Sequence, residues 1–232
     1  QHWRGRELRE GYTRTKGVAL ASLEHHLTST IGMTHPPHSH AEWLAIPEED
    51  ITHIVAGEVW HDPSGQFSAV RAALSAYYPE PVRLRRLAHW CRYFSGMGVY
   101  ALKRAMLRDN TLYASTTFAR SLRWGVQIAF MLDRRYYPYD KWLTEMFCRL
   151  PRMGPRLAHS LVLQLNALGA YEDARRVIEN QLEREWDSAL LSLYGDADGD
   201  APARVGRAEA WLKQYPREAN LLVVLGRLCR QQ

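Results

Sequence analysis

Apolar residues recur at helical spacing along most of this 232-residue chain. Side chains three or four residues apart lie on one face of an α-helix, so this spacing predicts helices that pack through a single apolar face. We therefore predict an all-α fold, a helical bundle followed by a short array of helical hairpins. The clearest examples are the run Thr111–Leu132 and the later set Leu161, Val162, Leu165 and Leu168.

Proline and glycine mark where several of these helices begin and end. We expect one helix from Val18 to near Gly32, a second opened by Pro47 and ended by Gly57, and a third opened by Pro138. Residues 58–61 are the only convincing strand candidate, which allows at most one small β-hairpin near residues 58–66.

Residues 62–65, Asp-Pro-Ser-Gly, predict a turn, because proline fixes φ and glycine accepts positive φ. His61, Asp62 and Ser64 include the side-chain types of a catalytic triad. Neighbours on one tight turn cannot converge as nucleophile, base and orienting group, so we expect a structural turn. Asp62 then caps the helix that begins near Gln66.

Aromatic residues divide the chain, since 20 of the 25 precede Gly154 and five follow it. We predict three parts: a loose N-terminal arm over residues 1–16, a helical domain over 17–153, and helical repeats over 154–232. In the third part, Gly169, Tyr171 and Ala174 have the spacing of a tetratricopeptide-type hinge. There glycine makes the turn, tyrosine wedges between the helices and alanine allows their close approach.

The formal net charge is +5, and 26 of the 30 cationic residues are arginine. Arginine binds phosphate and carboxylate in a bidentate manner, which suits nucleotide or RNA contact, although a GC-rich genome produces the same bias. The densest polar and aromatic cluster is residues 134–142, where cations alternate with rings. It is either a ligand site or an aromatic corner between helices, and its candidate ligand-binding residues are Arg134, Arg135, Tyr139 and Lys141.

The sequence predicts neither a metal nor a cofactor. His35, His38 and His40 lie in a proline-rich loop, which we expect to be solvated and not a four-ligand metal site, and we expect residues 196–200 to form an acidic linker. Motifs for nucleotide loops, dinucleotide binding, zinc proteases and serine hydrolases are absent. The three cysteines are widely separated and no apolar run is long enough to span a bilayer, so we expect a cytoplasmic protein without a membrane segment.

Two stretches before residue 153 carry a family resemblance: residues 56–65 and residues 130–142, together with Trp43, Arg71 and Tyr77. They resemble the C-terminal helical region of a bacterial nucleotidyltransferase-like family of the DUF4037 type, over about residues 18–152. The resemblance implies a preceding nucleotidyltransferase domain that holds magnesium and a nucleoside triphosphate. No residue of this sequence matches that catalytic part.

Residues 183–187, 193–195, 208–213 and 225–229 carry a second resemblance. They are similar to the tetratricopeptide-like C-terminal region of the HemY family, over about residues 155–232. This implies a protein or peptide partner held by the repeat half, with Tyr171, Trp186 and Trp211 as candidate partner-binding residues. A natural fusion, a fragment and a chimera all stay open.

We expect this chain alone not to be an enzyme. The first hypothesis is a non-catalytic binding or scaffold protein with an accessory module of nucleotidyltransferase-like type and a repeat module for protein interaction. The alternative is the acceptor- or nucleotide-positioning part of a nucleotidyltransferase whose catalytic domain lies outside this chain.

Overall fold

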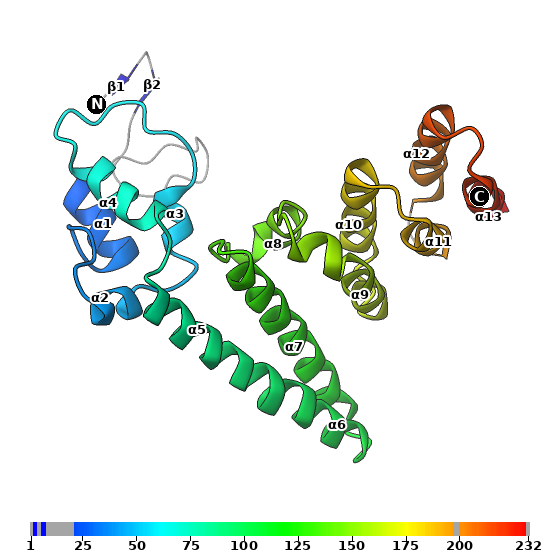
Figure 1. Ribbon diagram of the computed structural model, residues 1–232, viewed down its shortest axis with the longest axis horizontal. Helices are drawn as coiled ribbons and strands as arrows, with labels where there is room; N and C mark the ends of the chain where they lie inside the picture. The colour runs from blue at the N-terminus through cyan, green and yellow to red at the C-terminus, as the bar shows by residue number, and fades with distance from the viewer. Residues whose placement is uncertain (1, 4–5, 8–20, 197–199, 231–232) are drawn as a thin grey trace. The chain divides into compact units, whose positions relative to one another are not determined.

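The described residues, 2–3, 6–7, 21–196 and 200–230 of a computed structural model, are almost wholly helical (Figure 1). This confirms the predicted all-α fold. The strands in the described part are β1 (His2–Trp3) and β2 (Arg6–Glu7), which pair antiparallel with His2 opposite Glu7. They lie within the predicted loose arm, most of which falls outside the described residues. None of the described helices is long and apolar enough to cross a bilayer.

The chain divides into two compact units, and the boundary between them is crossed three times. Unit 1 comprises residues 1–86 and 136–139, and unit 2 comprises residues 87–135 and 140–232. The residues 136–139 therefore leave one unit and complete the other. The predicted boundary at Gly154 stays a prediction about organisation; α9 (Met153–Ala167) begins one residue before it.

The described part of unit 1 contains four short helices and most of a fifth. They are α1 (Leu23–Ile31), α2 (His40–Ala45), α3 (Ile51–Val55), α4 (Gln66–Ser75) and α5 (Glu80–Arg92), whose last six residues belong to unit 2. Their apolar faces form one core that includes Leu27, Ile31, Trp43, Ile46, Ile51, Ile54, Val70, Leu74, Tyr78 and Val82.

Local sequence explains where the helices of unit 1 begin and end. Ser39 and Glu42 form a reciprocal capping box at the start of α2. Gly32 ends α1 in the left-handed conformation, as predicted, whereas residues 18–20 of that expected helix lie outside the described residues. Pro47 opens a turn rather than a helix, and α3 begins at Ile51.

The expected strand at residues 58–61 is wrong, because this segment has no regular secondary structure. Trp60 is 82% exposed, so the segment lies at the surface, and a β-strand needs a hydrogen-bonded neighbour. The turn that follows it is confirmed. Gly65 N–H donates to Asp62 O at 3.1 Å, and Asp62 Oδ2 accepts from Ser68 N–H at 2.8 Å in the first turn of α4.

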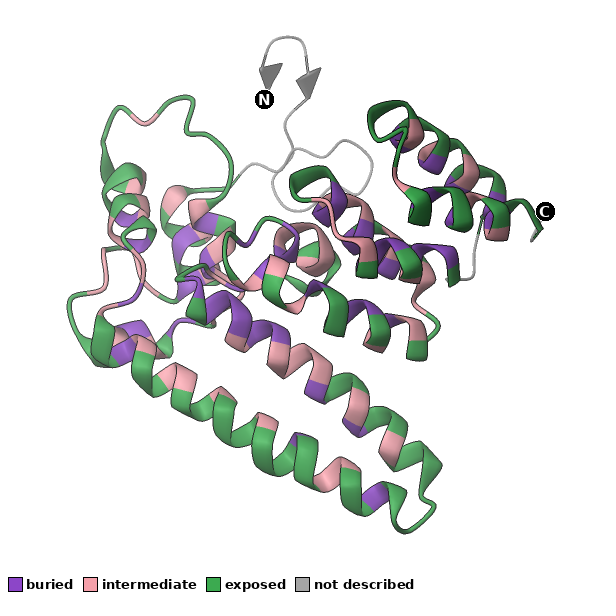
Figure 2. Cartoon of the chain, turned by 45° about the vertical axis from the view of Figure 1, so that its right-hand side comes forward, coloured by how far each residue is buried: buried purple, intermediate pink, exposed green. Residues whose placement is uncertain are grey.

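Unit 2 begins with a long helical hairpin. The end of α5 continues into the π-helix η1 (Tyr93–Tyr100) and then into α6 (Ala101–Met106). The chain then turns back into α7 (Thr111–Leu132), which has the predicted bounds and is capped by Asn110. Figure 2 shows buried positions along α7, while in α6 the buried residue is Ala105.

The remainder of unit 2 consists of short helices and helical hairpins. A 3-10 turn, η2 (Asp140–Trp142), precedes α8 (Leu143–Phe147), so Pro138 does not open this helix directly. Next come α9, α10 (Tyr171–Arg184), α11 (Ser188–Asp196), α12 (Ala201–Gln214) and α13 (Ala219–Arg230). Helices α9 and α10 pack against each other, as the hairpin predicted around Gly169 requires, and α13 packs against both α11 and α12.

Candidate functional site

The element that shapes the candidate site is the π-helix η1. A π-helix is rare, and short π segments within α-helices are often found at functional sites. Gly98 of η1 is buried against α7, where an added Cβ would lie 2.7 Å from Ser121 Oγ. Gly125 of α7 lies beside the ring of Phe94, where an added Cβ would be 3.3 Å from the nearest ring carbon. Small residues therefore let η1 and α7 approach closely.

A buried carboxylate joins the end of α7 to the start of α9. The side chain of Asp133, which is 0% exposed, accepts from Arg152 N–H at 3.0 Å and from Met153 N–H at 2.9 Å. It also pairs with Arg152 Nε at 3.1 Å. Because a carboxylate satisfies the first amides of a helix and favours its positive end, Asp133 fixes where α9 starts relative to α7.

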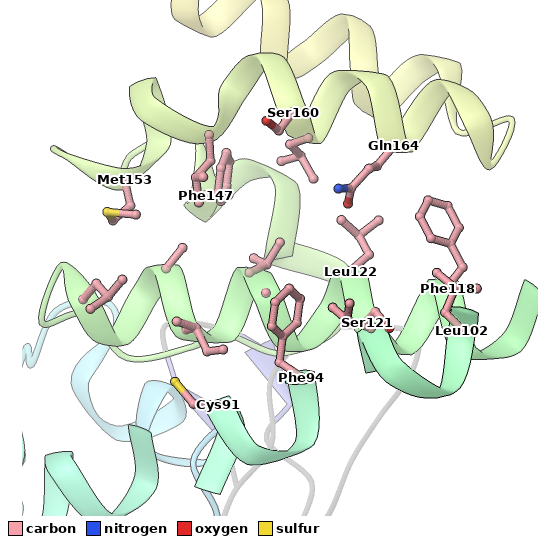
Figure 3. Close-up of a pocket in the computed structure, with 18 residues that line it drawn as sticks. Cys91, Phe94, Leu102, Phe118, Ser121, Leu122, Phe147, Met153, Ser160 and Gln164 are labelled. Atoms are coloured by element: carbon pink, nitrogen blue, oxygen red, sulfur yellow. The ribbon is translucent and has the colours of Figure 1, made fainter. Parts of the chain in front are cut away.

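Between these elements lies an apolar groove of about 500 Å³ (Figure 3). We call it the α7–α9 groove. Its walls are η1 with the adjoining turns of α5 and α6 on one side and α9 on the other, with α7 between them. It is lined by Cys91, Phe94, Val99, Leu102, Phe118, Ser121, Leu122, Gly125, Val126, Ile128, Ala129, Leu132, Phe147, Met153, Leu157, Ser160, Leu161 and Gln164.

The lining of the groove is suited to binding and not to acid–base chemistry. Its polar side chains are Cys91, Ser121, Ser160 and Gln164, and none of its described lining residues is charged. Ser121 Oγ already donates to Thr117 O at 2.7 Å within α7. A groove of this volume and apolar lining is suited to apolar ligands, since pockets of roughly 300–1,000 Å³ are typical of ligand sites.

A smaller hollow of about 190 Å³ shares four lining residues with the groove: Leu122, Val126, Phe147 and Leu161. It adds the ion pair between Arg123 Nε and Asp140 Oδ1, 3.0 Å apart. Leu122, Val126 and Leu161 thus present apolar surface to both hollows. The two hollows adjoin, and a charged pair lies beside the second.

The predicted ligand-binding residues are not brought together within one unit. Arg134, Arg135 and Lys141 belong to unit 2 and are exposed, whereas Tyr139, which is 49% exposed, belongs to unit 1. Arg134 has φ of 53°, and Lys141 Nζ lies 5.6 Å from the centre of the Trp142 ring. The role assigned to these four residues stays a prediction.

Other aromatic residues of the same stretch help to build unit 1. Tyr136 O–H donates to Leu74 O at 2.6 Å, and its ring lies 4.8 Å from that of Tyr77 and 4.9 Å from that of Tyr78. Burial raises the pKa of both Tyr78 and Tyr136. Tyr136 thus packs as part of an aromatic corner in unit 1.

The predicted partner-binding residues lie largely inside the hairpin array. Trp211 is 4% exposed, and its ring meets the Trp186 ring edge-on at 6.0 Å. Trp186 also stacks on Tyr215 at 4.2 Å, while Tyr171 is half-buried at the start of α10. These contacts place Trp186 and Trp211 in packing roles, and partner binding through them stays a prediction.

The histidine and acidic segments hold no arranged metal site in the described part of the chain. His35 and His38 stack on each other at 4.9 Å, and His40 is the first residue of α2. Among the described residues, no group of three or more His, Cys, Asp or Glu side chains could hold a metal ion. Residues 197–199 of the acidic segment lie outside the described residues, and Asp200 caps α12.

Sequence reasoning missed the α7–α9 groove. Apolar spacing places the lining residues of α7 and α9 on the apolar faces of separate helices, but spacing within a helix does not show whether two faces meet fully or leave a gap. One signal was present: small residues Gly98, Ser121 and Gly125 occur among large apolar ones. These small residues indicate that η1 and α7 approach closely. The groove lies beside this contact, between it and α9.

Residues 43–143 match a family model described as Domain of unknown function (DUF4037). The match supports the DUF4037-type resemblance over this region, which includes η1, α6 and α7 but not α9. The resemblance of the repeat half to the HemY family finds no support in the comparisons. No curated protein and no solved structure matches the chain.

Proposed function

We propose that this chain is a non-catalytic α-helical binding protein that receives an apolar ligand or an apolar segment of a partner in the α7–α9 groove. The observation that carries the proposal is the groove itself, about 500 Å³ of space lined almost wholly by apolar side chains. Many of them, including Phe94, Leu102, Phe118, Leu157 and Met153, are only half-buried. Their remaining apolar surface is available to stabilise a bound apolar group.

A neutral apolar dye, N-phenyl-1-naphthylamine, tests this proposal because its fluorescence rises when it leaves water. We expect saturable binding of one dye molecule per chain. Ser160 is exposed and lines the groove from α9, so Ser160→Trp fills it without disturbing the core. This variant should weaken dye binding at least about tenfold.

His159→Trp is the matched control, since His159 is the exposed neighbour of Ser160 and does not line the groove. It should bind the dye as the wild type does. Equal affinities for the wild type and Ser160→Trp, with both proteins folded, would rule out the groove as the binding site.

A second candidate function is the positioning of a nucleotide or acceptor for a catalytic domain outside this chain. It rests on the nucleotidyltransferase-like resemblance of this region and on the exposed cations Arg134, Arg135 and Lys141. Calorimetric titration with ATP and magnesium tests it, using an Arg134→Ala and Lys141→Ala double variant. Heat of binding that the double variant loses would support this function, and no heat with either protein would remove it.

A protein-interaction role for the repeat half, with Tyr171, Trp186 and Trp211 as contacts, and a cytoplasmic location are further parts of the proposal. The helical hairpins α9–α10 and α12–α13 have the architecture that such repeats use. Substituting Tyr171, which is half-buried at the start of α10, and measuring binding of the cellular partner would test the first of these.

A further inference from the structure

The length of the α7–α9 groove suits a helix. Along α7 it is lined from Phe118 to Leu132, which corresponds to about 21 Å at about 1.5 Å per residue. A bound helix of about four turns covers this length and places apolar side chains along it at positions i, i+4, i+7 and i+11. The groove is lined by helices throughout, so its walls offer the ridges against which another helix packs.

Four of the six helices that line the groove carry charge of one sign, while α8, which adds Phe147, carries Glu145 in an ion pair with Arg149. None of η1, α6, α7 and α9, all of whose residues are described, contains an aspartate or glutamate. The same four elements contain Lys103, Arg104, Arg120, Arg123 and Arg156. A ligand that approaches the groove past η1, α6, α7 or α9 therefore meets positive charge beside an apolar interior.

Two of these cations stand on opposite walls of the groove. Lys103 of α6 lies four residues after the lining residue Val99, and Arg156 of α9 lies four residues before the lining residue Ser160, so each is about one helical turn from the lining. Both are exposed, and neither forms an ion pair with any residue in the described ranges. They are placed to pair with carboxylates on the flanks of a helix whose apolar side enters the groove.

We propose that the occupant of the α7–α9 groove is an acidic amphipathic helix of a partner protein, with its apolar face in the groove and its carboxylates beside Lys103 and Arg156. This inference rests on the proposed function and specifies its ligand. A nucleic acid fits the cations but not the interior, because phosphates lose hydration in an apolar groove that offers no charged partner. A bilayer surface is flat and meets convex apolar surfaces, whereas this apolar surface is concave.

The test uses two synthetic peptides of about 16 residues that share the same leucine positions and differ in their flanking residues. One peptide carries glutamate on its flanks, and the other carries lysine. We expect the full chain to bind the acidic peptide at least about tenfold more tightly in fluorescence anisotropy, with the difference decreasing as salt is raised from about 50 to about 300 mM. Equal affinities, or tighter binding of the lysine peptide, would overturn the inference.

Variants locate the charge effect. Lys103→Glu combined with Arg156→Glu should weaken acidic-peptide binding at least about tenfold and leave binding of the neutral dye within about twofold. Arg120→Glu is the matched control, because Arg120 lies on α7 about 140° around the helix from the lining residue Gly125. It should bind the acidic peptide within about twofold of the wild type.

The outcomes separate the two proposals. Dye binding that Ser160→Trp blocks, without any preference for the acidic peptide, leaves the groove as an apolar site and refutes the helix as its occupant. Dye binding that Ser160→Trp does not affect refutes both. Tighter binding to phosphatidylglycerol vesicles or to a single-stranded oligonucleotide than to the acidic peptide also refutes the acidic helix, in favour of that ligand.

Discussion

Gly98 of η1 and Ser121 of α7 lie so close that a methyl group added to Gly98 would be 2.7 Å from Ser121 Oγ. This contact fixes the distance between the two helices beside the α7–α9 groove. Ser121 is buried and its hydroxyl is bonded to Thr117 O, so it cannot move away without losing that bond.

We expect Gly98→Ala to lower the free energy of unfolding by about 1–3 kcal/mol, because it overpacks a helix interface. Gly96→Ala is the control from the same π-helix, since no atom lies within 4 Å of the added Cβ. It should be neutral or stabilising by up to about 1 kcal/mol, owing to the lower helix propensity of glycine. Chemical denaturation measures both, and Ser121→Ala should recover part of the loss in the Gly98→Ala background.

Asp133 supports the start of α9. Asp133→Ala removes an acceptor for two backbone amides and for Arg152, so the free energy of unfolding should fall by about 1–3 kcal/mol. Asp140→Ala is a suitable comparison, because the Asp140 side chain is 61% exposed in its pair with Arg123. Its effect should stay within about 1 kcal/mol. Similar losses in both variants would show that Asp133 does not cap the helix.

In unit 1, Arg86 holds the end of α2. Its guanidinium donates to Trp43 O at 2.9 Å and to Ile46 O at 2.7 Å, and pairs with Glu48 at 2.9 Å. Arg86→Ala leaves these acceptors without their donor in a mostly buried site, so we expect a loss of about 2–4 kcal/mol in thermal or denaturant unfolding. Arg83→Ala removes a pair with Glu80 within α5 and should cost less than about 1 kcal/mol.

The three cysteines should differ in their reactivity. Burial raises the pKa of the Cys148 thiol to about 11, so below that pH the thiol keeps its proton. The thiolate is the nucleophile, and its fraction increases with pH until the pKa is passed. At pH 8 we therefore expect maleimide to label the exposed Cys91 and Cys229 well before Cys148, with the rate at Cys148 rising up to about pH 11. Peptide mass spectrometry identifies the labelled site, and rapid labelling of Cys148 at pH 8 would contradict its burial.

Several helix ends and caps could be predicted from the sequence. Helix α7 has the predicted bounds, Asp62 caps α4, and Gly169 ends α9, because each depends on residues within one or two turns. The strand expected at residues 58–61 is wrong, since a strand depends on a partner elsewhere in the chain. Propensity within a short segment cannot supply that partner.

Long-range placement could not be predicted in the same way. The sequence shows that residues 134–142 combine cations and rings, but not that Tyr136 would bond to Leu74, 62 residues earlier. The groove was missed for a related reason. An apolar stripe predicts that a helix face is covered, and only the arrangement of three helices shows that part of the face is left accessible.

Because residues 136–139 belong to unit 1, this unit cannot be produced as one continuous fragment of the chain. A fragment that stops after Arg86 lacks the tyrosine whose hydroxyl meets the carbonyl of Leu74. The hairpin over residues 87–135 is thus joined to unit 1 at both its ends, as an inserted segment would be. Removing it requires a linker between Arg86 and Tyr136.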